Sequence, residues 1–163
     1  MIAAVPTQSI IKDILDDTVK KQNGGLDFAV YAMAVVNSED MAAHHKLKVL
    51  AESRNDQLGR SLDRFACKGR TTDEQFKAWE DLLHKVDGAL RRLDRDFINA
   101  GQGQNVRVIF DVDMGGFFYE RLTSNSVLFA ATLDQAEVNN GRCEMEMHRM
   151  VAQIQAVFTV HGA

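Results

Sequence analysis

One stripe of apolar residues constrains the fold of this chain more than any other feature of its sequence. Its members recur at steps of three and four residues: Phe76, Trp79, Leu83, Val86, Leu90, Leu93 and Phe97. Such spacing places side chains along one face of a long helix and is typical of a coiled-coil contact with a second helix. Just before the stripe, Thr71 with Glu74 and Thr72 with Gln75 form two overlapping capping boxes, either of which predicts the start of this helix.

A second helix is expected over residues 38–68. At about 100° per residue its apolar side chains share one stripe, which consists of Leu47, Leu50, Ala51, Leu58, Leu62 and Phe65. Only a short turn from Cys67 to Thr71 separates the two helices, so the sequence predicts an antiparallel helical hairpin over about residues 38–99. Arg54 lies near the centre of the second stripe, where a cation needs a carboxylate, a carbonyl or solvent. It either sets the register of the helices or marks a stripe that the monomer covers only in part.

The N-terminal part of the chain contains a short helix and a segment with no polar face. The helix is expected to begin at Thr7 or Ser9 and to end at Asn23-Gly24-Gly25, because glycine accepts the backbone conformation that closes a helix. The segment that follows, LDFAVYAMAVVN over residues 26–37, must be covered on every side by this chain or by a neighbour. Its alanines and methionine favour a helix, whereas its valines and tyrosine also permit a strand.

After a polar, glycine-rich stretch the periodicity changes from that of a helix to that of a strand. Apolar and polar residues alternate over residues 106–113, and a second strand is expected at residues 117–122. The intervening Asp113-Met114-Gly115-Gly116 suits a hairpin turn, since glycine permits the positive φ angles that such turns require. A small β-hairpin over about residues 106–122 is therefore predicted.

Two C-terminal helices are expected after this hairpin. Residues 124–138 are predicted as a helix, although the Asn140-Gly141 that follows also favours a β-hairpin. Residues 143–158 carry a helical apolar stripe and are predicted as the last helix. A strand remains the alternative there, because the final residues alternate and include β-branched and aromatic side chains.

The length and composition fit one domain with a hydrophobic core. We expect an α+β, mainly helical, single domain over residues 1–163, with a helical part at about 7–100 and an α/β part at about 105–163. Two widely separated cysteines, Cys67 and Cys143, are expected to be reduced thiols of a cytoplasmic protein. The sequence shows neither a signal peptide nor an apolar run near the about 20 residues that span a bilayer.

The charge balance does not favour nucleic acid as a partner. The formal net charge is −4 and no block of the sequence is basic, whereas proteins that bind nucleic acid usually present a net positive face. A helical nucleic-acid-binding protein is kept as an alternative, and it would use Lys46, Arg60, Arg64 and Lys68.

One motif suggests an enzyme. VIFDVDMGG, residues 108–116, resembles the first motif of haloacid-dehalogenase-type phosphatases. The resemblance implies that Asp111 is the nucleophile, that Asp113 is a general acid, and that both help to hold magnesium. In this sequence Met114 separates the second aspartate from the glycines, and the later motifs of that family have no counterparts. The alternative is a β-hairpin whose acidic residues face solvent, so a magnesium-dependent phosphatase is kept only as a second hypothesis.

Metal ligands are sparse elsewhere. Glu144 and His148 are four residues apart on a predicted helix and can share one face, which makes them the best candidates for a metal site. A di-metal centre in a helical bundle needs further glutamates and a repeated Glu-x-x-His pattern, which this sequence lacks. We expect these two side chains to be solvated, and we expect no cofactor.

These observations favour a non-catalytic role. The helices of the predicted hairpin are long for this chain, and the predicted strands leave edges that can pair with another chain. We expect a structural or adaptor protein that self-associates or docks a protein partner, as a homo-oligomer or as a subunit of a larger complex. The residues expected to bind the partner are Arg54, Phe76, Trp79, Leu83, Val86, Leu90, Leu93 and Phe97.

Overall fold

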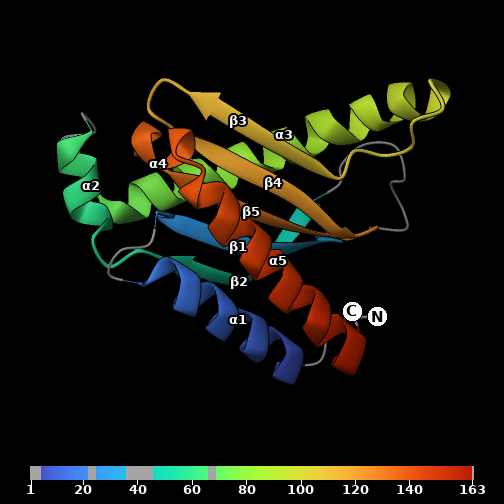
Figure 1. The fold of residues 1–163 in the computed structure, drawn as a ribbon, viewed down its shortest axis with the longest axis horizontal. Coiled ribbons are helices and arrows are strands. Elements are labelled where there is room, and N and C mark those ends of the chain that lie inside the picture. The colour runs from blue at the N-terminus through green and yellow to red at the C-terminus, as the bar shows by residue number, and fades with distance from the viewer. Residues whose placement is uncertain (1–4, 22–24, 36–45, 66–68, 163) are drawn as a thin grey trace.

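The computed structural model describes residues 5–21, 25–35, 46–65 and 69–162, which Figure 1 shows as a ribbon. The strands are β1 (Phe28–Val35), β2 (Lys46–Arg54), β3 (Arg107–Val112), β4 (Gly115–Thr123) and β5 (Ser126–Thr132). The helices are α1 (Val5–Val19), α2 (Leu58–Arg64), α3 (Thr72–Asn99), α4 (Gln135–Asn139) and α5 (Arg142–His161). The strands form one antiparallel sheet in the order β2-β1-β5-β4-β3.

Helices cover both faces of this sheet, which gives three layers (Figure 1). Behind the sheet in this view, α3 packs on it in one hydrophobic cluster, to which Leu83 and Phe129 belong. In front, α1 and α5 contact each other and form a second cluster with the opposite face, to which Leu128 and Ile154 belong. Leu128 and Phe129, adjacent on β5, thus point into different layers, as the alternation of side chains along a strand requires.

The segment without a polar face is the buried strand β1. It pairs with β2 on one side and β5 on the other. Phe28 and Val30 face α3, whereas Ala29 and Tyr31 face α1 and α5, and all four are fully buried. Residues 26–32 are buried, as expected of a segment that must be covered on every side, and the two layers of helices explain this cover; at the end of the strand Val35 is exposed.

The predicted helical hairpin over residues 38–99 is wrong. Residues 46–54 form the edge strand β2, which pairs with β1, and only residues 58–64 are helical, as α2. In β2, Leu47 is buried between the exposed Lys46 and Lys48, which is the alternation of a strand. Over a segment this short, the same apolar positions fit both the spacing of a helix and the alternation of a strand. Pairing with β1 decides in favour of the strand.

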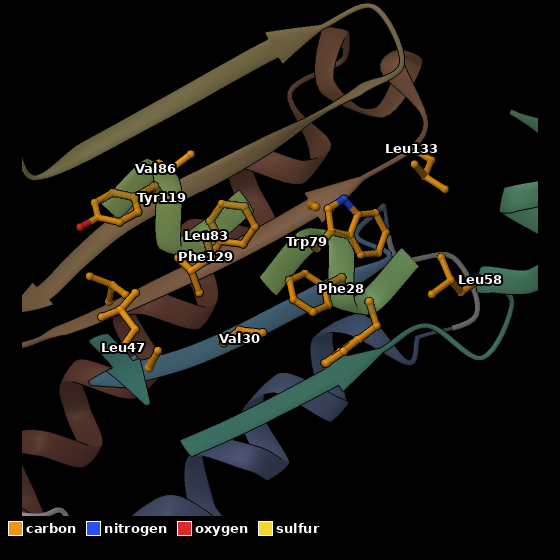
Figure 2. Packing of buried hydrophobic residues seen from close by; sticks show 14 of the residues in the cluster. Phe28, Val30, Leu47, Leu58, Trp79, Leu83, Val86, Tyr119, Phe129 and Leu133 are labelled. Atoms are coloured by element: carbon orange, nitrogen blue, oxygen red, sulfur yellow. The ribbon is translucent and has the colours of Figure 1, made fainter. Parts of the chain in front are cut away.

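The partner of the α3 stripe is therefore the sheet and not a second helix. Trp79 stacks on Phe28 of β1, with ring centroids 5.0 Å apart (Figure 2). Phe76 meets the same ring edge-on. The predicted helix over residues 124–138 is wrong in the same way. Its first half contains β5, every residue of which is buried between two strands and two layers of helices, and only its last residues are helical, as the start of α4.

Several individual elements are as predicted. The helix α3 begins with the capping box of Thr71 and Glu74, since Thr71 Oγ1 lies 3.1 Å from the Glu74 amide nitrogen, from which it accepts a hydrogen bond. The strands β3 and β4 form a hairpin with Asp113 and Met114 at its turn, and α5 is the predicted last helix. The helix start expected at residues 38–40, the helix stop at residues 23 and 24, and the turn at residues 67 and 68 lie outside the described residues.

Candidate functional site

The outer edge of β3 ends the sheet, because β3 is the last strand in the order and pairs with β4 on its inner side. The Arg121 amide donates a hydrogen bond of 2.8 Å to the carbonyl of Val106, which shows which residues of this segment bond to β4. Backbone groups in an antiparallel pair point alternately toward and away from the partner strand. The N–H and C=O groups of Arg107, Ile109 and Asp111 therefore point away from β4, to the free edge.

The large apolar side chains that are exposed gather around this edge. Among the described residues, the exposed ones on or near β3 and at the end of α3 are Leu93, Phe97, Ile98, Val106, Ile109, Val112 and Met114. Only Val35, Met145 and Val160 are exposed elsewhere in the part of the chain that the structure describes. Single exposed apolar side chains are normal, but seven of them along one strand, its turn and the end of α3 are more than scatter explains and indicate a candidate interaction surface. We call this group the β3 edge patch.

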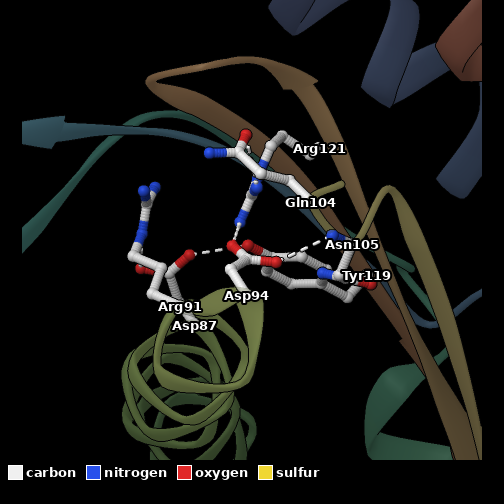
Figure 3. A network of polar contacts seen from close by, with 7 residues as sticks. All are labelled: Asp87, Arg91, Asp94, Gln104, Asn105, Tyr119 and Arg121. Carbon is white, nitrogen blue, oxygen red and sulfur yellow. Dashed lines mark hydrogen bonds and ion pairs between the residues drawn. The ribbon is translucent and has the colours of Figure 1, made fainter. Parts of the chain in front are cut away.

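A buried polar network fixes α3 beside this patch (Figure 3). Tyr119 of β4 donates a hydrogen bond of 2.7 Å from its hydroxyl to Asp87 Oδ1, and Arg91 Nε lies 3.0 Å from Asp87 Oδ2. The carboxylate is almost completely buried. Burial and the hydrogen bond to Asp87 both raise the pKa of Tyr119, so the phenol stays a donor at neutral pH. This pair ties the middle of α3 to the centre of β4.

The same network continues further along α3. Arg121 of β4 donates a hydrogen bond of 2.7 Å to Asp94 Oδ2, and both side chains are buried. Asp94 Oδ1 accepts a second hydrogen bond, of 2.7 Å, from the backbone amide of Asn105, which lies just before β3. One carboxylate thus joins α3, β4 and the segment that leads into β3. A buried ion pair of this kind fixes geometry more than it adds stability.

Five residues of the predicted partner-binding stripe lie in the core, because the sheet covers them (Figure 2). These buried residues are Phe76, Trp79, Leu83, Val86 and Leu90, of which Figure 2 labels Trp79, Leu83 and Val86. The other two positions of the stripe, at the end of α3, stay exposed, Leu93 by 44% and Phe97 by 36%. The stripe therefore has a covered part and a free end, and the free end belongs to the β3 edge patch.

Arg54 contacts two residues of α3. Its Nη1 atom lies 2.6 Å from Asp73 Oδ1 of α3, and its guanidinium lies over the ring of Phe76, 4.3 Å from the centroid. The cation thus joins the edge strand β2 to the first turns of α3. It packs on an aromatic ring and pairs with a carboxylate, as the sequence required of a cation in this position.

A groove lies between the first half of α3 and the β3–β4 turn. Its volume is about 480 Å³, and much of its lining is apolar. The lining side chains from α3 are Gln75, Ala78, Trp79, Asp81, Leu82 and Lys85, and those from the sheet include Val112, Met114, Phe117 and Leu133. Val112 and Met114 are also members of the β3 edge patch, so the groove and the patch are continuous.

The residues proposed for catalysis and metal binding are not gathered into a site. Asp111 and Asp113 are exposed, and Gln135 Nε2 lies 3.5 Å from Asp111 Oδ1. The sheet is antiparallel, whereas the phosphatase resemblance implies parallel strands alternating with helices. Glu144 and His148 lie about half-exposed on α5, 3.7 Å apart. Within the described residues no three potential ligands converge on a metal position.

The cations considered for nucleic-acid binding are also dispersed. Lys46 begins β2, Arg60 and Arg64 lie on α2, and Lys68 lies outside the described residues. Nor does any helix in the described part of the chain have the length and apolar character needed to cross a membrane.

Sequence reasoning missed five of the seven residues of the β3 edge patch, which are Ile98, Val106, Ile109, Val112 and Met114. The alternation of β3 was recognised, but its position at the end of the sheet was not. A signal was present, because Ile109 is an apolar residue on the face otherwise occupied by Arg107 and Asp111. A strand with apolar side chains on both faces must be covered on both faces to bury them. The helices cover β3 only in part, so some of its apolar side chains stay exposed.

The fold has known counterparts among solved structures. The gliding protein MglB from Thermus thermophilus superposes with a TM-score of 0.64 and 10% identity, covering 96% of this chain and 94% of that chain. The fold is that of MglB. Myxococcus xanthus MglB gives a TM-score of 0.62 at 9% identity, with 98% of this chain and 96% of that chain covered. A structure described as MglB with a tetrameric arrangement gives 0.61 at 10% identity, with 96% and 93% covered.

At such identities the MglB likeness establishes the fold and nothing finer. No protein-family model matches the sequence, and no curated protein matches it. The five-stranded sheet between two layers of helices thus replaces the predicted, mainly helical α+β fold with its long helical hairpin, and the MglB likeness over almost the whole chain supports this correction independently.

Proposed function

We propose that this protein is a non-catalytic assembly subunit that self-associates through the free edge of β3 and the adjoining flank of α3. The observation that carries the proposal is the β3 edge patch, where exposed apolar side chains surround a row of outward-pointing backbone groups. Natural proteins usually protect such edges, so an unprotected one indicates pairing with another strand.

Symmetry limits how two copies can pair here. A two-fold axis perpendicular to the sheet keeps each side chain on its own face, and opposite residues in an antiparallel pair share a face. Residues that meet across the axis must therefore be separated by an even number of positions, so one residue of β3 faces its own counterpart. Ile109 is the best centre, because it is the middle one of the three residues whose backbone groups point outward.

Charge supports the same register. With Ile109 opposite Ile109 of the second copy, Arg107 lies opposite Asp111 of that copy, twice by symmetry. The Arg107 guanidinium already contacts Glu120, with Nη2 2.9 Å from Oε1, but its side chain is 44% exposed and has donors to spare. On the other face Val108 lies opposite Phe110 of the second copy, a β-branched and aromatic pair of the kind that stabilises sheets.

The MglB likeness supports assembly as a role for this fold, because one of the similar structures is described as having a tetrameric arrangement. That description belongs to MglB, and for this chain we propose the pairing of two copies as the basic step. We also keep the prediction of a cytoplasmic protein that acts by binding other proteins.

The test is the solution mass of the purified protein as a function of concentration, by light scattering and analytical ultracentrifugation. We expect a dimer or a multiple of it that dissociates on dilution. The proposal would be wrong if the protein stayed a strict monomer up to high micromolar concentration and captured no partner.

A further inference from the structure

We infer that a polar pocket between α2 and α4 binds a small zwitterion, a molecule such as a free amino acid that carries both an ammonium group and a carboxylate. The pocket has a volume of about 250 Å³. It lies where β1 begins and β5 ends, and α2 and α4 lie at that same end of the sheet (Figure 1). It shares no residue with the β3 edge patch, so the inference goes beyond self-association and does not depend on it.

A buried carboxylate, that of Asp27, lines the pocket. Asp27 is only 7% exposed. Its Oδ2 accepts a hydrogen bond of 2.8 Å from the Leu133 amide, whereas Oδ1 has only a long contact of 3.4 Å with the Ser61 hydroxyl. The charges that act on Asp27 are those of Asp134 and Glu137, which are acidic as well. A buried carboxylate without a cation is unfavourable, so an ammonium group that enters the pocket would gain from pairing with it.

Glu137 supplies a second acceptor. Its Oε2 atom is buried and has no hydrogen-bond partner among the described residues, and its contact with Arg142 Nη1 is 3.6 Å long. Gly25 leaves room for this carboxylate, since a Cβ atom at position 25 would lie 2.8 Å from Oε2. An ammonium group carries three donors on one small cation, so it can bond to both carboxylates at once.

The exposed rim of the pocket carries cations instead. Arg60 and Arg64 lie one turn apart on α2, line the pocket and are exposed. The ion pairs of the described residues include neither of them. The guanidinium of Arg64 lies over the ring of Phe65, 5.0 Å from the centroid. Guanidinium groups bind carboxylates through paired hydrogen bonds, so this rim suits the anionic end of a ligand.

The arrangement of charge selects the class of ligand. The acceptors lie inside the pocket and the donors at its rim, so a molecule with a cation at one end and an anion at the other matches both. The carboxylates of Asp27, Asp134 and Glu137 outnumber the two guanidinium groups, which favours a singly charged carboxylate over a phosphate of about two charges. The volume lies just below the about 300–1,000 Å³ of sites for drug-sized ligands, which indicates a molecule of amino-acid size.

The state of Asp27 is unfavourable for the fold and suited to binding. Burial raises the pKa of Asp27 to about 6, because the empty pocket offers its charged form little stabilisation. Titratable groups perturbed in this way cluster at functional sites. The charged and titratable groups that line the pocket or act on Asp27 come from three helices and the cap of α4: Arg60, Arg64, Asp134, Glu137 and Cys143.

The test is an NMR titration of the full chain with ω-amino acids of increasing length, from glycine to 6-aminohexanoate. The reporter is the Leu133 amide, because it donates a hydrogen bond to Asp27. We expect at least one of these probes to shift it with a dissociation constant below about 1 mM. The matched probes are the amine and the carboxylate of the same chain length, each with one charged group only. We expect each to bind about tenfold or more weakly, and equal binding of the amine would contradict the inference.

Two variants divide the roles of the residues. Asp27→Asn keeps an oxygen for the Leu133 amide but loses the charge, and it should weaken binding of the zwitterion about tenfold or more. Arg64→Gln should weaken binding of the zwitterion about fivefold and leave the affinity for the amine unchanged. Arg95→Gln, at an exposed position of α3 outside the pocket, is the matched control and should bind as the wild-type chain does.

The pH dependence is a further readout. The affinity of the wild-type chain should rise about tenfold between pH 5 and pH 7, because Asp27 with its pKa of about 6 must lose its proton before it pairs with an ammonium group. In Asp27→Asn this rise should be absent. A wild-type affinity that does not change with pH would show that Asp27 does not bind the ligand.

The outcomes are independent of the proposed function. If no ω-amino acid shifts the Leu133 amide at about 10 mM, or if Asp27→Asn binds as the wild-type chain does, the inference is wrong whatever the oligomeric state. Ile109→Lys, which should disrupt self-association, should bind the same probe with unchanged affinity. A chain that binds the zwitterion but stays a monomer would refute the proposed function alone.

Discussion

The two edge strands of the sheet, β2 and β3, differ in the side chains that they expose to solvent and in the regularity of their pairing. On β2 the exposed positions include Lys46 and Lys48, and the pairing with β1 shifts register after Tyr31, which marks a bulge. On β3 the pairing with β4 is regular, and Ile109 and Val112 are exposed. Lysines and bulges are devices by which proteins keep edge strands from pairing with other chains. The edge strand β2 thus carries both lysines and a bulge, whereas β3 has a regular register and exposes apolar residues beside its charged Arg107 and Asp111.

The layers of helices show the same asymmetry. The helix α1 contacts β2 extensively, so one face of that edge strand is covered. Near β3 the cover is partial, because α5 lies beside Arg107 and Ile109 but leaves Ile109 exposed, and α3 ends in exposed apolar residues. A protein with one protected and one open edge is built to associate in one direction only, which favours a closed pair over an open-ended chain of copies.

The largest expected effect comes from closing the open edge. Ile109→Lys places a charge at the centre of the proposed pairing, and we expect the dissociation constant to rise more than about a hundredfold. Analytical ultracentrifugation measures it. Met145→Lys is the matched control, since Met145 is also an exposed apolar residue but lies on α5. Equal weakening by both variants would contradict a specific role for β3.

The second prediction concerns the protected side of the molecule. Asp27, next to β1, is buried, and its Oδ2 accepts a hydrogen bond of 2.8 Å from the Leu133 amide. Burial raises the pKa of Asp27 from 3.8 to about 6. As the pH rises through this interval the unfolded chain loses its proton first, so the folded state loses stability, by at most about 3 kcal/mol.

Asp27→Asn should remove this loss while keeping an oxygen for the Leu133 amide. Relative to the wild-type chain, we expect the variant to gain about 1–2 kcal/mol of unfolding free energy between pH 4 and pH 7. Urea unfolding at several pH values measures it, with Asp17→Asn on the exposed face of α1 as the control. The dimer affinity should not change. A parallel change in affinity would show that the two sides of the molecule are not independent.

A smaller effect is expected from the charges that flank Ile109. Asp111→Lys should weaken the dimer about fivefold, because a lysine would face Arg107 of the second copy, and the effect should shrink at high salt. Asp113→Lys makes the same change of charge in the turn, outside the proposed strand pairing. If Asp113→Lys weakens the dimer as much as Asp111→Lys does, the register centred on Ile109 is incorrect.

The smallest effect is expected from opening the protected edge. Lys48→Ile removes a charged side chain from β2 and should change the free energy of unfolding by less than about 0.5 kcal/mol. It should nevertheless produce weak association at high protein concentration, visible as a rise in scattered light. Lys77→Ile on the exposed side of α3 is the control. No difference between these variants would mean that Lys48 does not protect the edge.

The part of the fold that the sequence predicts best is the part with two agreeing signals. For α3 the apolar stripe and the Thr71 capping box coincide, and the helix is present. For β2 only a short stripe was available, and Leu47 and Ala51 fit both a helix and a strand. The packing partner of α3 could not be predicted from the sequence either, since a stripe that contains Phe76 and Trp79 packs equally well on a helix or on a sheet.

The candidate site was predictable only in part. The free end of the stripe, Leu93 and Phe97, was among the residues expected to bind a partner, because every stripe position was included. Leu93 and Phe97 are exposed whereas Leu83 is buried, because the sheet ends before it reaches the last turns of α3. Where the sheet ends depends on the pairing of strands that are far apart in sequence. The role of Ile109 follows from the position of β3 in the strand order, and no local pattern encodes that position.

The central claim is that the outward-pointing backbone groups of β3 pair with a second copy. Amide hydrogen exchange tests it directly, because the Ile109 amide points to the free edge and the Val108 amide points to β4. We predict that exchange at Ile109 slows as the protein concentration rises through the dissociation constant, while exchange at Val108 is slow throughout. Exchange at Ile109 that stays fast at every concentration, in a protein whose mass has doubled, would contradict pairing through β3.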